Sequence, residues 1–177
     1  ATVCWGKLYH RSCFDGERYP VGKHMEDEFL TYRLLFAQEA LTVIPAPLYA
    51  YYFNPTGITK SAWTPGRLDA WEAYEQQIAF FEQRGEWDLV RFRYRGYLEN
   101  AVVNEADARQ AQDSPEVLAA RKRIHATIKD LLKRMSRLHY LEFWPDSELL
   151  LEYFPVRARI YRLYLETRAR LERKKNA

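Results

Sequence analysis

The sequence has 177 residues, of which 47% are hydrophobic, 29% charged and 15% aromatic, with a formal net charge of +3. These proportions suit one good core, or a small unit with an appendage, and they exclude both charge-rich disorder and a membrane protein. No stretch approaches the roughly 20 apolar residues that a membrane-spanning helix needs. The N-terminus lacks the pattern of a secretory signal. It also begins without methionine, from which we expect a piece of a longer protein.

The first sixty residues predict short strands and one helix. Apolar segments at residues 5–9, 42–44 and 47–53 predict strands, and the last is rich in tyrosine and bounded by proline and glycine. Between them, Leu30 and Leu34 share one face of a helix predicted over residues 26–38. Such an incomplete sheet needs partners to cover it. We therefore expect exposed apolar surface that favours self-association.

From residue 64 the pattern is helical to the end. A Thr-Pro pair at residues 64–65 begins one helix and Gly85 ends it. After a second helix, a Ser-Pro pair at 114–115 begins a third, and a Trp-Pro pair at 144–145 breaks it before a last helix. The predicted core positions of a helical hairpin or bundle are Leu68, Trp71, Tyr74, Ile78, Phe81, Val90, Tyr94, Tyr97, Ala101, Val117, Ile124, Ile128, Leu131, Met135 and Leu138.

The two cysteines do not suffice for a disulfide framework and indicate a reducing cytosol. Cys4 and Cys13 could join His10 and His24 in a zinc site, although the spacing matches no common ligand pattern. The simpler interpretation is two small buried hydrophobes beside a surface histidine.

Basic residues dominate positions 157–175. Such a tail suits anionic lipid headgroups or nucleic acid. The alternative is a solvated helix face whose cations favour the negative end of the helix dipole. Because tyrosines at helical spacing predict core positions better than a base-stacking platform, we expect no nucleic-acid partner.

Three adjacent acids, Glu26, Asp27 and Glu28, begin the first predicted helix. One interpretation is charge compensation, because acids are favoured in the first turn by the helix dipole. The other is a general base, a carboxylate positioned to take a proton. Neighbouring residues of a helix point about 100° apart, so only one of Glu26 and Asp27 is expected to face a substrate.

Four segments, taken in order, resemble the later part of bacterial family 2 glycosyltransferases. They are residues 5–9 (Trp-Gly-Lys-Leu-Tyr), 18–23 (Arg-Tyr-Pro-Val-Gly-Lys), 26–28 (Glu-Asp-Glu) and 47–51 (Pro-Leu-Tyr-Ala-Tyr). The resemblance covers about the first sixty residues, and residues 64–85 resemble the helix that commonly follows.

The resemblance implies an α+β, mostly α chain. Residues 1–62 would be the acceptor-side part of a nucleotide-diphospho-sugar transferase (GT-A) fold with a few short strands, without the nucleotide-binding half. Residues 63–177 would be a C-terminal helical region.

The implied reaction is sugar transfer from a nucleotide sugar to an acceptor hydroxyl with inversion. Asp27 falls on the family's general base, and Glu26 would help to position the acceptor. Trp5 and Lys7 would line the donor or acceptor pocket; the alternative is a strand in which Trp5 is packed and Lys7 solvated. Asn54 stands where many members carry histidine or arginine near the diphosphate.

Divalent metal, Mg²⁺ or Mn²⁺, is expected in the intact enzyme. The family's metal-binding aspartate pair lies upstream of this sequence, so no metal is expected to bind this fragment, and the fragment alone is expected to transfer no sugar. We expect a cytoplasmic enzyme of cell-surface polysaccharide or glycan synthesis, with a nucleotide sugar and a glycan acceptor as partners. The basic tail suits peripheral contact with the inner membrane face, or a homo-oligomer. The alternative is a non-catalytic helical interaction module with a basic C-terminal helix.

Overall fold

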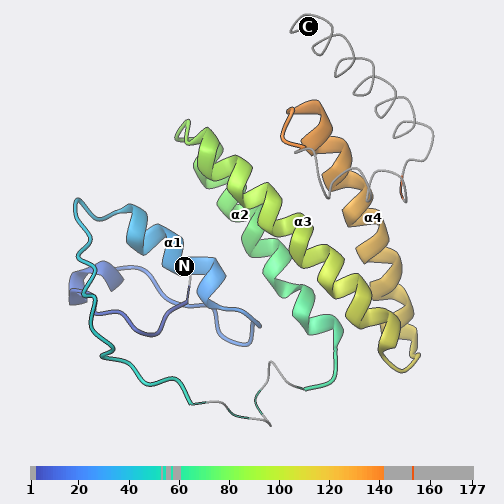
Figure 1. Ribbon diagram of the computed structural model, residues 1–177, viewed down its shortest axis with the longest axis horizontal. Helices are drawn as coiled ribbons and strands as arrows, with labels where there is room; N and C mark the ends of the chain where they lie inside the picture. The colour runs from blue at the N-terminus through green and yellow to red at the C-terminus, as the bar shows by residue number, and fades with distance from the viewer. Residues whose placement is uncertain (1–2, 53, 55–56, 58–60, 142–152, 154–177) are drawn as a thin grey trace, which may run out of the picture. The chain divides into compact units, whose positions relative to one another are not determined.

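The computed structural model describes residues 3–52, 54, 57, 61–141 and 153 (Figure 1). It has two compact units, Ala1–His125 and Ala126–Ala177. The elements in chain order are the 3-10 helix η1 (Arg11–Phe14), α1 (Asp27–Phe36), the 3-10 helix η3 (Pro65–Asp69), α2 (Ala70–Glu82), α3 (Trp87–Gln110) and α4 (Pro115–Arg137).

The helices α2 and α3 form a hairpin that holds most of the core of the first unit (Figure 1). Gly85 lies in the connection with φ +71°, a conformation that glycine adopts without strain. The Tyr97 ring packs 5.8 Å from Trp71 and 5.4 Å from Tyr74, measured between centroids. The buried stripes predicted for these two helices are therefore confirmed.

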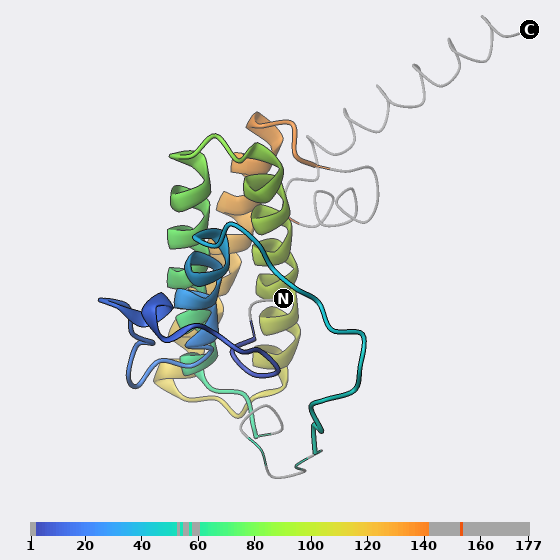
Figure 2. The ribbon, with the colours of Figure 1, turned by 90° about the vertical axis from the view of Figure 1, so that its left-hand side faces the viewer.

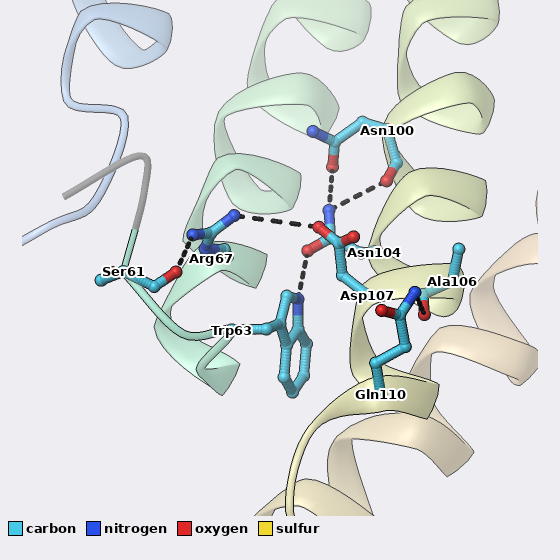
Figure 3. Close-up of polar contacts among 8 residues, drawn as sticks. All are labelled: Ser61, Trp63, Arg67, Asn100, Asn104, Ala106, Asp107 and Gln110. Carbon is cyan, nitrogen blue, oxygen red and sulfur yellow. Dashed lines mark hydrogen bonds and ion pairs between the residues drawn. The ribbon is translucent and has the colours of Figure 1, made fainter. Parts of the chain in front are cut away.

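Indole and amide groups fix the segment before α2 to α3 (Figure 3). The Trp63 indole N–H donates to Oδ1 of Asn104 at 2.8 Å. The Nδ2 of Asn104 donates in turn to the carbonyl oxygen of Asn100 at 2.9 Å, while the Trp71 indole N–H donates to Oδ1 of Asn100 at 2.9 Å. Both indole donors are thereby satisfied, as buried polar groups must be.

Helix α1 packs against α2 through an aromatic cluster. The rings of Tyr32 and Phe36 both pack edge-on against the Phe80 ring, with centroids 5.2 Å and 5.3 Å away respectively. Leu30 and Leu34 are buried on the inner face. The predicted helix over residues 26–38 is confirmed, within two residues at each end.

The predicted strands are wrong. The described residues contain no strand and no sheet, so the α+β class and the partial GT-A sheet are replaced by an all-helical architecture. Residues 5–9 and 42–52 are extended or irregular, and Figure 2 shows the segment after α1 as a thread with no strand beside it. A strand exists only when a neighbour takes its backbone hydrogen bonds. In addition, Pro45 and Pro47 each remove a backbone donor from this segment.

The start of α4 belongs to the first unit. Ser114 Oγ accepts from the Val117 N–H at 3.2 Å, so the Ser-Pro start is confirmed. Arg121 donates to the carbonyl oxygens of Ala108 and Ala111 at 2.8 and 2.9 Å, which satisfies acceptors at the end of α3.

In the second unit, α4 continues to Arg137 with a buried stripe made of Ile128, Leu131, Leu132 and Met135. The predicted break at residues 144–145, the last helix and the basic tail at 157–175 lie outside the described residues. Within the described part of the chain, no helix combines the length and the apolar character needed to cross a membrane.

Candidate functional site

The start of α1 contains the three acids, and the backbone before it is constrained. Met25 has φ 56°, a left-handed conformation that is rare for a residue with a side chain. The Glu28 N–H donates both to the Met25 carbonyl oxygen at 3.1 Å and to Oδ1 of Asp27 at 3.0 Å. Conformations of this kind gather at functional sites, where surrounding contacts hold them in place.

The Glu28 side chain faces the helical hairpin and is hydrogen-bonded to it. Its carboxylate accepts from Nε2 of Gln77 at 2.9 Å and from Nη1 of Arg93 at 3.2 Å. Gln77 Nε2 also donates to the Glu28 carbonyl oxygen at 2.6 Å, and Arg93 donates to Oε1 of Gln77 at 3.0 Å. The side chains of Glu28 and Arg93 are 11% and 12% exposed. Glu28 is therefore a structural acid, bound in a buried network.

Asp27 keeps a half-buried carboxylate beside this network. Burial raises its pKa above the usual range, and the negative charges of Glu28 and Glu26 raise it further. A carboxylate with a raised pKa is a stronger base than an exposed one. Glu26 precedes the helix, is half-buried and forms no side-chain cap hydrogen bond. The structure therefore brings Asp27 and Glu26 together at one helix end.

The basic-aromatic segment before α1 is anchored to the next helices. Lys23 Nζ forms an ion pair with Glu72 of α2 at 2.7 Å, and the His24 N–H donates to Oδ2 of Asp69 at 3.2 Å. The Tyr19 hydroxyl lies 3.1 Å from Oγ1 of Thr31, which is buried in α1. Two of the four family-like segments, 18–23 and 26–28, are thus fixed around one helix.

The other two family-like segments meet through aromatic rings. Trp5 stacks on Tyr49 with centroids 5.2 Å apart and planes 16° from parallel, and it lies 5.2 Å from Tyr51. All three rings are exposed. Lys7 is half-buried, and its Nζ donates to the carbonyl oxygen of Val3 at 2.6 Å, which holds the loop around Trp5.

Asn54 is exposed, and its carbonyl oxygen accepts from the Gly57 N–H at 3.1 Å. No three His, Cys, Asp or Glu side chains in the described part of the chain are grouped so that they could hold a metal ion. The described residues therefore do not fit the divalent metal that the resemblance implies for the intact enzyme.

Sequence reasoning missed Gln77, Arg93, Tyr49 and Tyr51. Gln77 and Arg93 interrupt the apolar patterns of α2 and α3. The signal in the sequence was a polar residue, Gln77, at a helix position that lies in the core. Tyr49 and Tyr51 were in a recognised segment but were assigned to a strand. Their spacing of two residues places both rings on the same side of an extended chain.

Comparisons with known proteins indicate a relationship to glycosyltransferases. No family model matches the chain, and no solved structure matches it. Over 104 residues the chain is 26% identical to EpsH of Bacillus subtilis (strain 168), which is named as a glycosyltransferase; the match covers 56% of this chain and 29% of that protein. Over 120 residues it is 24% identical to the glycosyltransferase GlyA of Streptococcus pneumoniae serotype 4 (strain ATCC BAA-334 / TIGR4), covering 60% of this chain and 17% of that protein. The chain thus spans less than a third of either relative, and it is a distant relative of part of a glycosyltransferase.

Proposed function

We propose that this chain is the acceptor-side part of a family 2 glycosyltransferase that moves a sugar from a nucleotide sugar to an acceptor hydroxyl with inversion. The observation that carries the proposal is the division among the three acids. Glu28 is bound in a buried network, whereas Asp27 remains half-buried with a raised pKa. The glycosyltransferase names of both relatives support the reaction class.

In the proposed reaction, Asp27 takes the proton of the acceptor hydroxyl. The acceptor oxygen then forms a bond to the anomeric carbon, and the bond from that carbon to the diphosphate oxygen breaks. The nucleoside diphosphate leaves with the electron pair. Attack from the side opposite the leaving group inverts the anomeric carbon. The raised pKa of Asp27 favours this step because it brings the base closer to the working pH.

The remaining site residues have supporting roles in the proposal. Glu26 helps to position the acceptor, and Trp5 offers an exposed ring face to a sugar. Lys7 holds the backbone of the Trp5 loop, and Asn54 lies in the loop expected near the diphosphate. The product would be a cell-surface polysaccharide or glycan made on the cytoplasmic side, with peripheral contact at the membrane.

Divalent metal in the intact enzyme would offset the charge of the leaving diphosphate, held by residues other than those described here. In keeping with this division, we expect the 177-residue chain alone to transfer no sugar. Incubation with Mg²⁺ or Mn²⁺ and a panel of nucleotide sugars should show neither transfer nor donor hydrolysis. Clear turnover by the isolated chain would contradict this part of the proposal.

The test of the base is Asp27→Asn in the intact enzyme, with Asp88→Asn as the matched control. Both aspartates lie in the first turn of a helix, but Asp88 is exposed on α3. Asp27→Asn should reduce turnover by about 10²-fold or more, the size of a general-base contribution. Asp88→Asn should leave turnover near wild type. Unchanged turnover in Asp27→Asn would remove Asp27 from the mechanism.

A further inference from the structure

Hydrogen bonds on the two peptide groups that flank Glu28 connect the helical hairpin to the carboxylate of Asp27. Arg93 donates to Oε1 of Gln77 at 3.0 Å, and Gln77 Nε2 donates to the carbonyl oxygen of Glu28 at 2.6 Å. The N–H of Glu28 then donates to Oδ1 of Asp27 at 3.0 Å. This contact and a hydrogen bond from the backbone N–H of Asp27 itself orient the Asp27 carboxylate at the start of α1.

We propose that Gln77 and Arg93 are positioning residues for Asp27, so that the α2–α3 hairpin sets the direction in which the proposed base faces the acceptor. This inference rests on the proposed function. It assigns the hairpin a role in the reaction, through residues that follow Glu28 by 49 and 65 positions in the sequence.

The composition of this chain of contacts favours positioning over simple packing. Gln77 is 1% exposed, and Glu28 and Arg93 form an ion pair whose side chains are 11% and 12% exposed. A buried ion pair often stabilises a fold no better than apolar residues of the same size would. Directional hydrogen bonds nevertheless hold one geometry that apolar contacts would leave loose, even though Nε of Arg93 is buried without a hydrogen-bond partner among the described residues.

Arg93 is itself held in one orientation. Its guanidinium lies 4.4 Å from the centroid of the Tyr74 ring, a cation–π distance, while Nη1 reaches both Gln77 and Glu28. The charges that raise the pKa of Asp27, in addition to burial, are those of Glu28 and Glu26 on its own segment, and Arg93 on α3 is paired with Glu28.

The test is Gln77→Met in the 177-residue chain, with Gln76→Met as the control. Gln76 is the neighbouring, exposed residue of α2, whose amide reaches only Glu72 on its own helix at 3.3 Å. Carbon-13 NMR titration of the Asp27 carboxyl and amide hydrogen exchange at Glu28 are measured in both variants. Neither readout requires a substrate.

In Gln77→Met, the Glu28 amide should exchange roughly tenfold faster, the order expected when a hydrogen bond that holds the turn is lost. Greater access to water should bring the pKa of Asp27 down toward its usual value. Amides in the middle of α3 should exchange as in wild type, and Gln76→Met should change neither readout. A folded Gln77→Met chain with both readouts unchanged would overturn the proposal.

If Gln77→Met fails to fold, Glu28→Gln is the second test variant. The amide oxygen can still accept from Gln77, but the negative charge beside Asp27 is gone, so the pKa of Asp27 should fall. An unchanged Asp27 titration in this variant would contradict the coupling. In the intact enzyme, Gln77→Met should lower kcat with little change in the KM of the acceptor, which separates positioning from substrate binding.

The two proposals can fail separately. If Asp27→Asn leaves turnover of the intact enzyme unchanged while the NMR results hold, the contacts stand and the role of Asp27 as a base is wrong. If Asp27→Asn abolishes turnover but Gln77→Met changes neither NMR readout, the role of Asp27 as the base is retained. The hairpin then has only a structural role.

Discussion

The helical hairpin and the N-terminal segments of the first unit differ in how they bury apolar residues. On the hairpin, Trp71 is 1% and Leu98 2% exposed, whereas Trp5 is 44% and Leu8 100% exposed in the N-terminal segments. A helix satisfies its own backbone hydrogen bonds and needs one neighbouring face to form a core. Extended segments require a partner for both backbone and side chains. In this chain the segments that resemble glycosyltransferases therefore contain the candidate site residues, while the helical hairpin supplies most of the buried apolar core.

This difference predicts that truncating a tryptophan will cost far more stability at a buried position of the hairpin than at an exposed position on a helix or in the N-terminal segments. Trp71→Ala should destabilise the chain by about 3–5 kcal/mol, because it empties a core site against Tyr97 and removes the hydrogen bond to Asn100. Urea denaturation followed by circular dichroism measures the change. Trp87→Ala is the control on a helix, since Trp87 is 59% exposed, and it should cost far less. Equal losses in the two variants would contradict the assignment of the core.

A smaller loss is expected where the hairpin is held by polar contacts. Asn104→Leu should cost about 1–3 kcal/mol, because it leaves the buried Trp63 indole N–H without its acceptor (Figure 3). Trp63→Phe removes the donor instead. In the double variant the loss should be clearly less than the sum of the two single losses, which a double-mutant cycle with the same denaturation measures. Additive losses would show that this hydrogen bond contributes nothing to stability.

At the start of α1 we expect a smaller change in stability, and a gain rather than a loss, from Asp27→Asn. Burial and the charges of Glu26 and Glu28 raise the pKa of Asp27 in the folded chain above its value in the unfolded chain. The folded state therefore binds the proton more tightly, and the ionised carboxylate reduces stability at neutral pH. Asp27→Asn, whose side-chain oxygen can still accept from Glu28, should match or exceed the wild-type Tm at pH 7.

That gain should be complete above the folded-state pKa of Asp27 and should vanish as the pH falls below the unfolded-state value. Thermal denaturation of both chains between pH 7 and pH 3 measures it. Asp88→Asn, on the exposed first turn of α3, is the control and should show no such trend. A lower Tm for Asp27→Asn at pH 7 would mean that Asp27 mainly compensates the helix dipole, which is the alternative interpretation of the three acids.

The sequence predicted the helices well and the strands wrongly, for one physical reason. Helical periodicity is local, so the spacing of Trp71, Tyr74 and Ile78 was sufficient to predict a buried face. A strand depends on residues elsewhere, and the apolar runs at 5–9 and 47–53 do not say whether a neighbour is present. The extended or irregular course of residues 42–52 after α1 is the consequence (Figure 2).

The candidate site was predictable only in part. The run of acids indicated where a base could lie, but it could not show which acid would be bound by Gln77 and Arg93, because those contacts join residues far apart in sequence. The stacking of Trp5 on Tyr49 was equally hidden, since it joins two segments more than forty residues apart. Side-chain partners at long range are decided by the fold.

The smallest expected effect on stability belongs to Trp5→Ala. Its ring is 44% exposed and contacts chiefly Tyr49 and Tyr51, so the loss should be about 0.5–1.5 kcal/mol, the value of an aromatic stack. The same urea denaturation measures it, and Tyr49→Ala is the partner for a double-mutant cycle that isolates the stack. A loss as large as that of Trp71→Ala would place Trp5 in the core. A small loss would leave its ring face exposed and available to a sugar, as the proposed function requires.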